Sequence, residues 1–158
     1  MIFVTVGTQL AFDRLVCAVD DWASRHEERV VVQAGPDADG ARWPNIEAKG
    51  HMAPKDYEAQ FSTARVVVGH AGIGTILSAQ RFGKPLVILP RRQVLGEHRN
   101  DHQMATAREV SRLKGIHIAW EAAEIPALLA QDLVAAETDG GDSRGRLISR
   151  LRIFIDEA

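Results

Sequence analysis

The stretch Arg65-Val66-Val67-Val68-Gly69-His70-Ala71-Gly72-Ile73-Gly74-Thr75 joins an apolar run to a glycine-rich turn. It leads directly into residues 76–82, which have the composition of a helix. Glycines let a backbone approach an anion closely, and the first turn of a helix presents unpaired N–H groups and the positive end of a dipole. The stretch therefore predicts a strand, a phosphate-binding turn and a helix in succession.

Short β-branched runs alternate with segments of helical period along the rest of the chain. Apolar residues recur at spacings of three and four within residues 12–23, which indicates an amphipathic helix. The expected strands are Ile2–Val6, Arg29–Ala34, Asn45–Lys49, Arg65–Gly69, Leu86–Leu89 and Ile116–Ala119. The further expected helices are Pro54–Thr63, Thr75–Phe82, Asn100–Leu113 and a terminal helix at residues 143–158. This alternation predicts an α/β, Rossmann-like fold with a mostly parallel sheet and helices on both faces.

The composition is that of one soluble domain. Of the 158 residues, 46% are hydrophobic and 25% charged, so we expect a single domain over residues 1–158. A net charge of −2 gives no support to broad nucleic-acid binding. A single cysteine, Cys17, excludes an internal disulfide, and Met1 leads straight into a strand without a targeting signal, so we expect a cytoplasmic protein. No apolar run approaches the roughly 20 residues that span a bilayer.

The expected strand order places two glycine-bearing loops at one crevice. If the six strands lie in the order 3-2-1-4-5-6, the crevice lies outside the carboxyl ends of the first and fourth strands. The loop Gly7-Thr8-Gln9 follows the first strand, and the turn at residues 69–75 follows the fourth. Two independent features therefore predict one ligand site.

Two common nucleotide-binding patterns are missing. The first turn has one glycine instead of Gly-x-Gly-x-x-Gly, and the strand that ends near Gln33 has no carboxylate placed to bind a ribose. The Walker pattern with its Lys-Ser/Thr is also absent. These observations argue against an NAD site and against P-loop nucleotide hydrolases.

Metal binding is the less favoured interpretation of two acidic or histidine-bearing segments. Asp37-Ala38-Asp39 lies among glycine and proline residues, so we favour a solvated loop over a metal-binding pair. His98 and His102, with Asp101, have the spacing of a metal-binding face, but no third well-placed ligand is evident. We therefore expect no metal.

The glycine-rich turn and the residues after it resemble a known signature. Residues 70–79 read His-Ala-Gly-Ile-Gly-Thr-Ile-Leu-Ser-Ala, and Gly83-Lys84-Pro85, Pro90 and Gln103 follow. This order resembles the donor-binding signature of GT-B glycosyltransferases. Residues 3–9 and 96–103 narrow the resemblance to the C-terminal domain of glycosyltransferase family 28 as a separate chain. Such chains include the cytosolic subunit of the split dolichol-pathway UDP-GlcNAc transferase and, as the nearer likeness, the small subunits of paired bacterial exopolysaccharide and capsule glycosyltransferases.

The resemblance implies a set of substrate-binding residues: Gly7, Thr8, Gln9, His70, Gly72, Gly74, Thr75, Ser78, Arg99, Asn100, His102 and Gln103. Residues 7–9 would line the diphosphate side, and Gln103 with His102 would meet the sugar hydroxyls. The pyrophosphate would be held by His70, Gly72, Gly74 and Thr75. His51 or Met52 falls near where relatives contact the uracil. Many relatives have a Glu at the position of Ser78, where it binds the ribose, so this chain departs from the pattern there.

The charged residues near the fifth strand have two interpretations. In one, Arg91, Arg92 and Arg99 are ordinary solvated surface charges, which is the usual role of such runs. In the other, they flank the predicted crevice and would attract an anionic donor or acceptor.

The implied reaction is a metal-independent, inverting transfer of a hexose from a UDP-sugar, with no cofactor. Negative charge grows on the leaving phosphate, so a helix end and His70 fixed at that phosphate would stabilise the transition state. A carboxamide such as Gln103 can bind two sugar hydroxyls through one donor and one acceptor.

A GT-B enzyme has its acceptor site, and usually its general base, on a second lobe, for which this chain has no room. The resemblance therefore implies a membrane-associated partner that binds a lipid-linked acceptor for a surface polysaccharide and recruits this chain to the inner face of the plasma membrane. An apolar stripe on the terminal helix fits partner docking: Leu147, Ile148, Leu151, Phe154 and Ile155. A helix packed on its own core and a helix on a membrane surface are the alternatives.

Two other functions stay open. In the first alternative, the chain is a non-catalytic subunit that stabilises or anchors a catalytic partner. In the second, it is another nucleotide-sugar enzyme, such as an epimerase. The catalytic residues are unknown from sequence, and glucose, glucuronic acid, galactose and N-acetylglucosamine all remain possible donor sugars.

Overall fold

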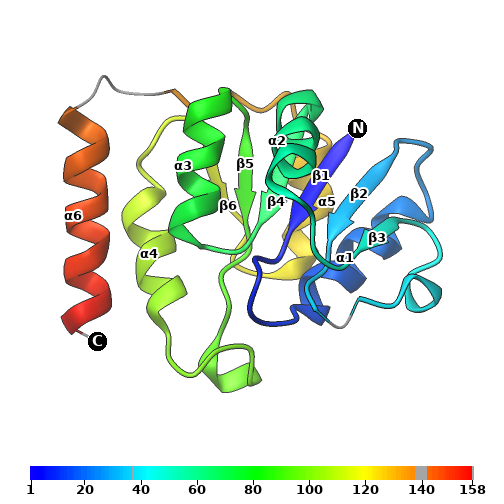
Figure 1. Ribbon diagram of the computed structural model, residues 1–158, viewed down its shortest axis with the longest axis horizontal. Coiled ribbons are helices and arrows are strands. Elements are labelled where there is room, and N and C mark those ends of the chain that lie inside the picture. The colour runs from blue at the N-terminus through cyan, green and yellow to red at the C-terminus, as the bar shows by residue number, and fades with distance from the viewer. Residues whose placement is uncertain (37, 138–141, 158) are drawn as a thin grey trace.

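The computed structural model describes residues 1–36, 38–137 and 142–157. Within these residues, six strands form one parallel sheet in the order β3-β2-β1-β4-β5-β6 (Figure 1). The strands are β1 (Ile2–Thr5), β2 (Val30–Gln33), β3 (Glu47–Lys49), β4 (Val66–Gly69), β5 (Leu86–Ile88) and β6 (Ile116–Ile118). This architecture confirms the expected α/β, Rossmann-like fold, and its strand order is the one that was assumed in placing the crevice.

The central strands are buried on both faces. Every residue of β1, β2 and β4 is buried, and their largely apolar sequences lack the polar alternation of a half-exposed strand. The register sets Thr5 of β1 opposite both Gln33 of β2 and Gly69 of β4. The carboxyl ends of three central strands therefore finish in polar or glycine residues at one edge of the sheet.

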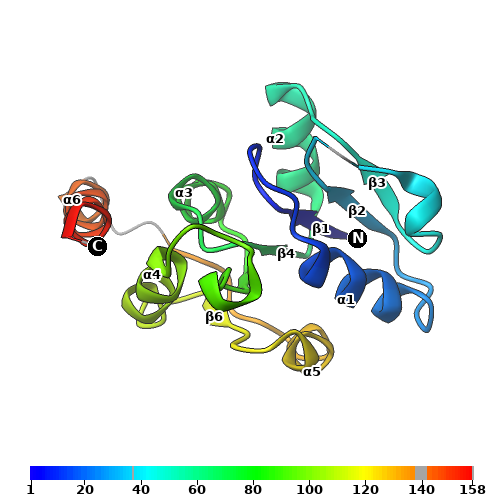
Figure 2. The same cartoon turned by 90° about the horizontal axis from the view of Figure 1, so that it is seen from below.

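Helices cover both faces of the sheet (Figure 2). On one face lie α1 (Asp13–Ala23) and α5 (Ile125–Leu129), and on the other lie α2 (Pro54–Thr63), α3 (Ile73–Phe82) and α4 (His102–Val110). Leu15, Val19 and Ile125 belong to the first apolar layer, whereas Phe61 and Ile76 belong to the second. The sheet is thus the middle of three layers, which explains its uninterrupted apolar strands.

Helix α3 begins two residues earlier than the sequence predicts. Gly72 is its N-cap, and Gly83 ends it in the left-handed conformation at φ 60°. The earlier start places Gly74 and Thr75 in the first turn, where backbone N–H groups lack intrahelical partners. Helix α4 is shorter at both ends than the expected Asn100–Leu113, because Asp101 is its N-cap and Ser111 its C-cap. The 3₁₀ turn η2 (Gln93–Leu95) and an irregular loop precede it.

Helix α5 was not expected from the sequence. It follows the 3₁₀ turn η3 (Ala122–Glu124), which is closed by a capping box between Glu121 and Glu124. Its five residues are too few to display a helical period. Burial of Ile125 and Leu129 stabilises it, since α5 packs against α1.

The terminal helix α6 (Asp142–Glu157) packs outside α3 and α4. Leu151 is fully buried and Leu147 partly buried in the second apolar layer, and Arg150 forms an ion pair with Glu109 of α4. At these positions the helix packs on the chain's own core, which was the alternative to partner docking. The side chains of Phe154 and Ile155 lie outside the described residues. In the described part of the chain, no helix combines the length and the apolar character that crossing a membrane requires.

Candidate functional site

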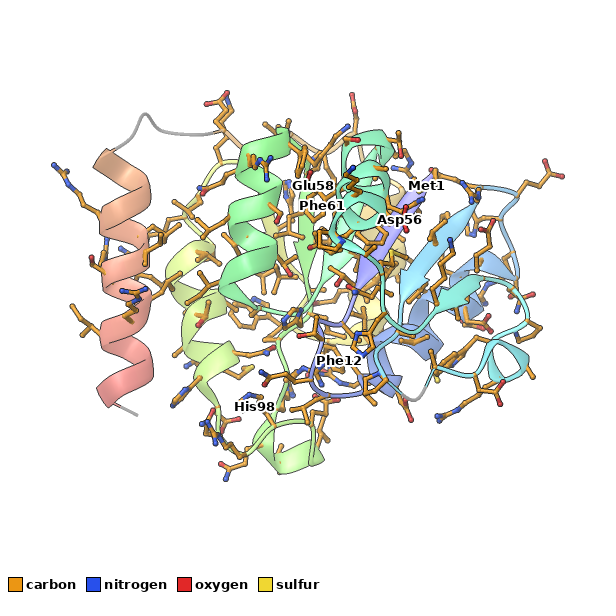
Figure 3. All side chains as sticks on the ribbon, in the orientation of Figure 1. Met1, Phe12, Asp56, Glu58, Phe61 and His98 are labelled. Carbon is orange, nitrogen blue, oxygen red and sulfur yellow. The ribbon has the colours of Figure 1, made fainter. Side chains whose placement is uncertain are left out.

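A cavity of about 510 Å³ opens at the carboxyl edge of the sheet. This volume is within the usual range for small-molecule sites. The loops after β1 and β5 lie together at this edge, where Figure 3 labels Phe12 and His98. The lining residues are Thr5, Val6, Gly7, Thr8, Gln9, Leu10, Gln33, Met52, Pro54, Tyr57, His70, Gly74, Thr75, Ser78, Arg91, His98 and Gln103.

Gly7 turns the chain out of β1 and into the cavity wall. Its φ of 83° lies in the left-handed region, and a Cβ there would come within 3.0 Å of the His70 ring. The Gly7 N–H donates to Thr5 Oγ1 at 3.3 Å, and the Thr5 hydroxyl donates to Gln33 Oε1 at 2.8 Å. A polar chain therefore connects the ends of β1 and β2 to the first loop.

His70 follows β4, and its ring lies beside both Gly7 and Gly72. A Cβ on Gly72 would lie 2.2 Å from His70 Nε2, so only glycine fits there. Burial, and secondly the positive charge of Arg91, lower the pKa of His70 to about 4. Its Nδ1 is buried and has no hydrogen-bond partner in the described structure. The ring is therefore neutral at neutral pH and has unused hydrogen-bonding capacity.

Helix α3 presents its N-terminus to the cavity. Gly74 and Thr75 lie in the first turn and line the cavity, and the helix begins its ladder with a 3.2 Å bond from the Ile76 N–H to the Gly72 carbonyl. A Cβ on Gly74 would meet nothing within 4 Å, so the backbone here is open to a ligand. Unpaired N–H groups and the helix dipole together favour an anion at this position.

Tyr57 of α2 supplies a hydroxyl that the sequence analysis missed. Burial raises the pKa of Tyr57, whereas hydrogen bonds with Ser78, Thr75 and Thr5 act in the opposite direction. The phenol therefore joins the polar chain at the end of β1. Ser78 has Tyr57 as its neighbour. In the sequence, the spacing within residues 54–63 predicts only that Tyr57 lies on a helix, and nothing in it indicates that the Tyr57 hydroxyl reaches the cavity.

Gln103, in the first turn of α4, connects two loops. Its Oε1 accepts hydrogen bonds from the N–H of Ala71, at 3.2 Å, and of Arg91, at 3.1 Å. Because both partners are donors, the carbonyl end of the amide must face them. We expected this carbonyl to accept a bond from a sugar hydroxyl, but the backbone already occupies it. The NH₂ group is what Gln103 has left for a ligand.

Arg91 is buried, with 2% of its surface exposed, although composition alone favoured a surface charge. Its carboxylate neighbour, Glu97, is instead bound by Arg14 at 2.6 and 2.9 Å. Burial lowers the pKa of Arg91 to about 10, so the guanidinium stays charged at neutral pH. No Asp or Glu is among the described residues that line the cavity. A buried positive charge therefore faces the cavity without a carboxylate beside it there.

Four expected residues do not line the cavity: Gly72, Arg99, Asn100 and His102. Gly72 makes room for the His70 ring, and the Asn100 side chain accepts a bond from the His102 N–H at 3.2 Å. His98 lines the cavity instead of His102, and its Nδ1 lies 3.4 Å from the Asn100 N–H. The sequence offered both histidines, and only the loop conformation separates them.

The two segments considered for metal binding show no metal-binding geometry where they are described. Asp39 accepts a bond from the Ala41 N–H as the N-cap of η1 (Gly40–Arg42), and Asp37 lies outside the described residues. Over the described ranges, no three His, Cys, Asp or Glu side chains are grouped as ligands.

The fold and the cavity together define a Rossmann-like lobe with an anion-favouring ligand site at the carboxyl edge of its sheet. Comparison with known families matches residues 1–141 to the glycosyltransferase family 28 C-terminal domain. The chain belongs to this family.

Three known proteins illustrate the likeness. The UDP-N-acetylglucosamine transferase subunit ALG13 of Eremothecium gossypii is 33% identical in an alignment of 91 residues that covers 51% of this chain and 45% of that protein, so the match spans about half of each. The NMR structure of ALG13 gives a TM-score of 0.64 at 17% identity, covering 92% of this chain and 93% of that chain. The crystal structure of Acinetobacter baumannii MurG gives a TM-score of 0.59 at 18% identity, and the match covers 80% of this chain and 39% of that chain. At these identities, the two structural likenesses show the fold alone.

Proposed function

We propose that this chain is the donor-binding subunit of a two-component, inverting glycosyltransferase that takes a hexose from a UDP-sugar. The observation that carries the proposal is the composition of the cavity wall: the α3 N-terminus, the Gly7 loop and buried Arg91, with no carboxylate among the described lining residues. Such a wall favours a pyrophosphate. Family membership supports a glycosyltransferase role, and the name of the Eremothecium relative makes UDP-N-acetylglucosamine the first donor to test.

In this proposal the chain stabilises the leaving nucleotide. Negative charge grows on the departing phosphate as the glycosyl bond breaks, and donors fixed at that position lower the barrier. The first-turn N–H groups of α3 would donate to the phosphate. The single N–H of the neutral His70 ring is used by a hydrogen bond with the Thr5 backbone, so His70 would donate to the phosphate once the bound anion has raised its pKa and the ring is protonated. The charge of Arg91 would add an attraction that water screens little, because the guanidinium is buried.

The general base would come from a second polypeptide. A pKa of about 4 makes His70 a weak base at neutral pH, and the described cavity wall offers no carboxylate. We propose that this partner is membrane-associated, binds a lipid-linked acceptor for a surface polysaccharide, and holds the chain at the cytoplasmic side of the plasma membrane.

An apolar rim next to the cavity is the surface that we assign to this partner. Leu10, Val94 and Leu95 are 45%, 85% and 52% exposed. They lie on the loops after β1 and β5, which also supply cavity residues, so a partner seated there would bring an acceptor close to the donor. The rim is favoured over α6, whose Leu147 and Leu151 pack on the core.

Calorimetric titration of the purified chain with UDP and the four UDP-sugars tests the donor proposal. Gly74→Ala introduces a methyl group where the backbone is open, so it should leave the fold intact and weaken UDP binding by about tenfold or more. Gly40→Ala is the matched control, because a Cβ there also meets nothing within 4 Å and residue 40 is not among the cavity residues. Failure of both the chain and its co-purified pair to bind millimolar UDP would contradict the proposal.

A further inference from the structure

We propose that Arg91 is a positioning residue that holds residues 6–11, the loop after β1, in the conformation that forms one wall of the cavity. The ligand to be tested, UDP, rests on the proposed function. The conformation of the loop is a property of the ligand-free chain, so it can be measured independently.

The guanidinium binds the loop on both sides of its turn. Arg91 Nη2 donates to the Val6 and Leu10 carbonyls at 2.8 Å each, and Nη1 donates to the Ala11 carbonyl at 2.6 Å. These partners come before and after Gly7-Thr8-Gln9, so one side chain closes the turn. Within the described structure, the side chains of exposed Thr8 and Gln9 make no hydrogen bond of their own.

Arg91 is itself held from three directions. Its guanidinium lies 4.4 Å from the ring centroid of buried Phe12, and its backbone N–H donates to Gln103 Oε1 at 3.1 Å. Nη1 also lies 3.4 Å from the Glu97 carbonyl. The loop after β1 is therefore fixed to the loop after β5 and to α4 through one residue.

Only an arginine meets this set of partners. The planar fork carries five donors in fixed directions, whereas a lysine ammonium is a compact point charge with three. Burying a cation is unfavourable unless its donors are satisfied, and here carbonyls of the loop satisfy them. Loop order and burial of Arg91 are therefore two sides of the same interaction.

A loop held in its binding conformation binds with its full affinity. If the loop populates that conformation only in a fraction of molecules, the apparent dissociation constant rises by the inverse of that fraction. Loss of the arginine fork should therefore loosen the loop and weaken ligand binding together, while the core stays ordered.

The experiment compares Arg91→Lys with wild type, using backbone NMR order parameters of the ligand-free chain and calorimetric titration with UDP. In Arg91→Lys, the order parameters of residues 7–11 should fall from about 0.85 to below about 0.6, whereas those of β1 and β4 should not change. The affinity for UDP should fall by about tenfold or more. Arg92→Lys is the matched control, since the Arg92 side chain binds Glu121 and the Trp120 carbonyl, away from the loop. It should change neither quantity.

An unchanged order parameter for residues 7–11 in folded Arg91→Lys overturns the proposal, even if UDP affinity falls. Phe12→Leu gives a second route if Arg91→Lys does not fold, because it keeps an apolar core side chain and removes the ring beneath the guanidinium; it should also loosen residues 7–11. A wild-type chain that does not bind UDP contradicts the proposed function alone, and the order parameters still decide the role of Arg91.

Discussion

His70 and Arg91 show how burial divides charge between two basic side chains of one cavity. Desolvation lowers the pKa of both side chains. The pKa of Arg91 falls only to about 10, so its guanidinium remains a cation at neutral pH, whereas the pKa of His70 falls to about 4. The cavity therefore contains one fixed charge and one neutral hydrogen-bonding ring at neutral pH. A bound anion would raise the pKa of His70, because an opposite charge favours the protonated form.

We expect His70→Asn to remove part of the acid sensitivity of folding. The unfolded chain, with a histidine pKa of about 6.5, binds a proton that the folded chain does not accept until about pH 4. The stability that neutral His70 confers is therefore complete above about pH 6.5 and is lost as pH falls towards 4, by up to about 3 kcal/mol. Urea unfolding of both proteins at pH 7 and pH 4.5 measures the difference, and an equal loss in both would contradict the low pKa.

Substitutions of Gln103 should separate its structural bonds from its role towards a ligand. Gln103→Leu leaves the N–H groups of Ala71 and Arg91 without an acceptor, which should cost about 2–4 kcal/mol. Gln103→Glu keeps an acceptor for both, so it should stay closer to wild type in urea unfolding. Its negative charge and missing NH₂ group should weaken UDP binding in calorimetry. A Gln103→Leu variant as stable as wild type would show that these bonds contribute little.

At the scale of elements, the cavity is built from the ends of strands and helices. The interiors of β1, β2 and β4 are apolar and buried, and they set positions without facing a ligand. Thr5, Gln33 and the first turn of α3 come directly at the ends, where parallel strands bring different loops to one edge. The rigid sheet therefore fixes where these loops begin, and Arg91 and Gln103 fix how they continue.

Away from the cavity, the backbone at Gly115, just before β6, lies close to the backbone of residues 135–136. Gly115 has φ 78°, and a Cβ there would come within 2.3 Å of the Ala135 and Ala136 backbone. We expect Gly115→Ala to destabilise the fold by about 3–5 kcal/mol in urea unfolding, from strain and overlap together. Gly96→Ala is the matched control: φ is 69° but nothing lies within 4 Å, so strain alone should cost about 1–2 kcal/mol. Equal costs would show that the segment after α5 moves aside.

At the scale of the whole molecule, the apolar surfaces divide into those that pack inside the chain and those that stay exposed. The buried face of α6 packs against the second apolar layer, whereas Leu10, Val94 and Leu95 remain exposed on the loops after β1 and β5. Exposed apolar groups on loops that also supply cavity residues are candidates for an interaction surface.

We expect Val94→Asp to disrupt assembly with the proposed partner while UDP binding by the isolated chain is unchanged. The reason is that Val94 is 85% exposed and does not line the cavity. Val134→Asp is the matched control, because Val134 is 51% exposed but lies beside β6, with its carbonyl 3.4 Å from His117 Nε2. Co-purification of the pair measures assembly, and retention of the partner by Val94→Asp would place the interface elsewhere.

The sequence alone determined the fold class and, once the strand order common to such folds was assumed, the edge of the sheet where the cavity lies. The fold class follows from local signals, because β-branched runs, helical period and glycines at strand ends are properties of neighbouring residues. The segment Pro54–Thr63 was placed with its observed bounds, and residues 7–9 and 74–75 were expected where the cavity lies. The sequence did not predict helix α5, because burial against α1 stabilises it and its five residues show no helical period.

Only the tertiary structure decided what several side chains do there. Arg91 and the Val6 carbonyl are 85 positions apart, and Gln103 and the Ala71 N–H are 32 apart, so no local pattern reports that they meet. The same holds for Tyr57 beside Ser78, and for His98 lining the cavity in place of His102. Burial, charge state and hydrogen-bond partners are set by neighbours in space, whereas the sequence specifies directly only neighbours along the chain.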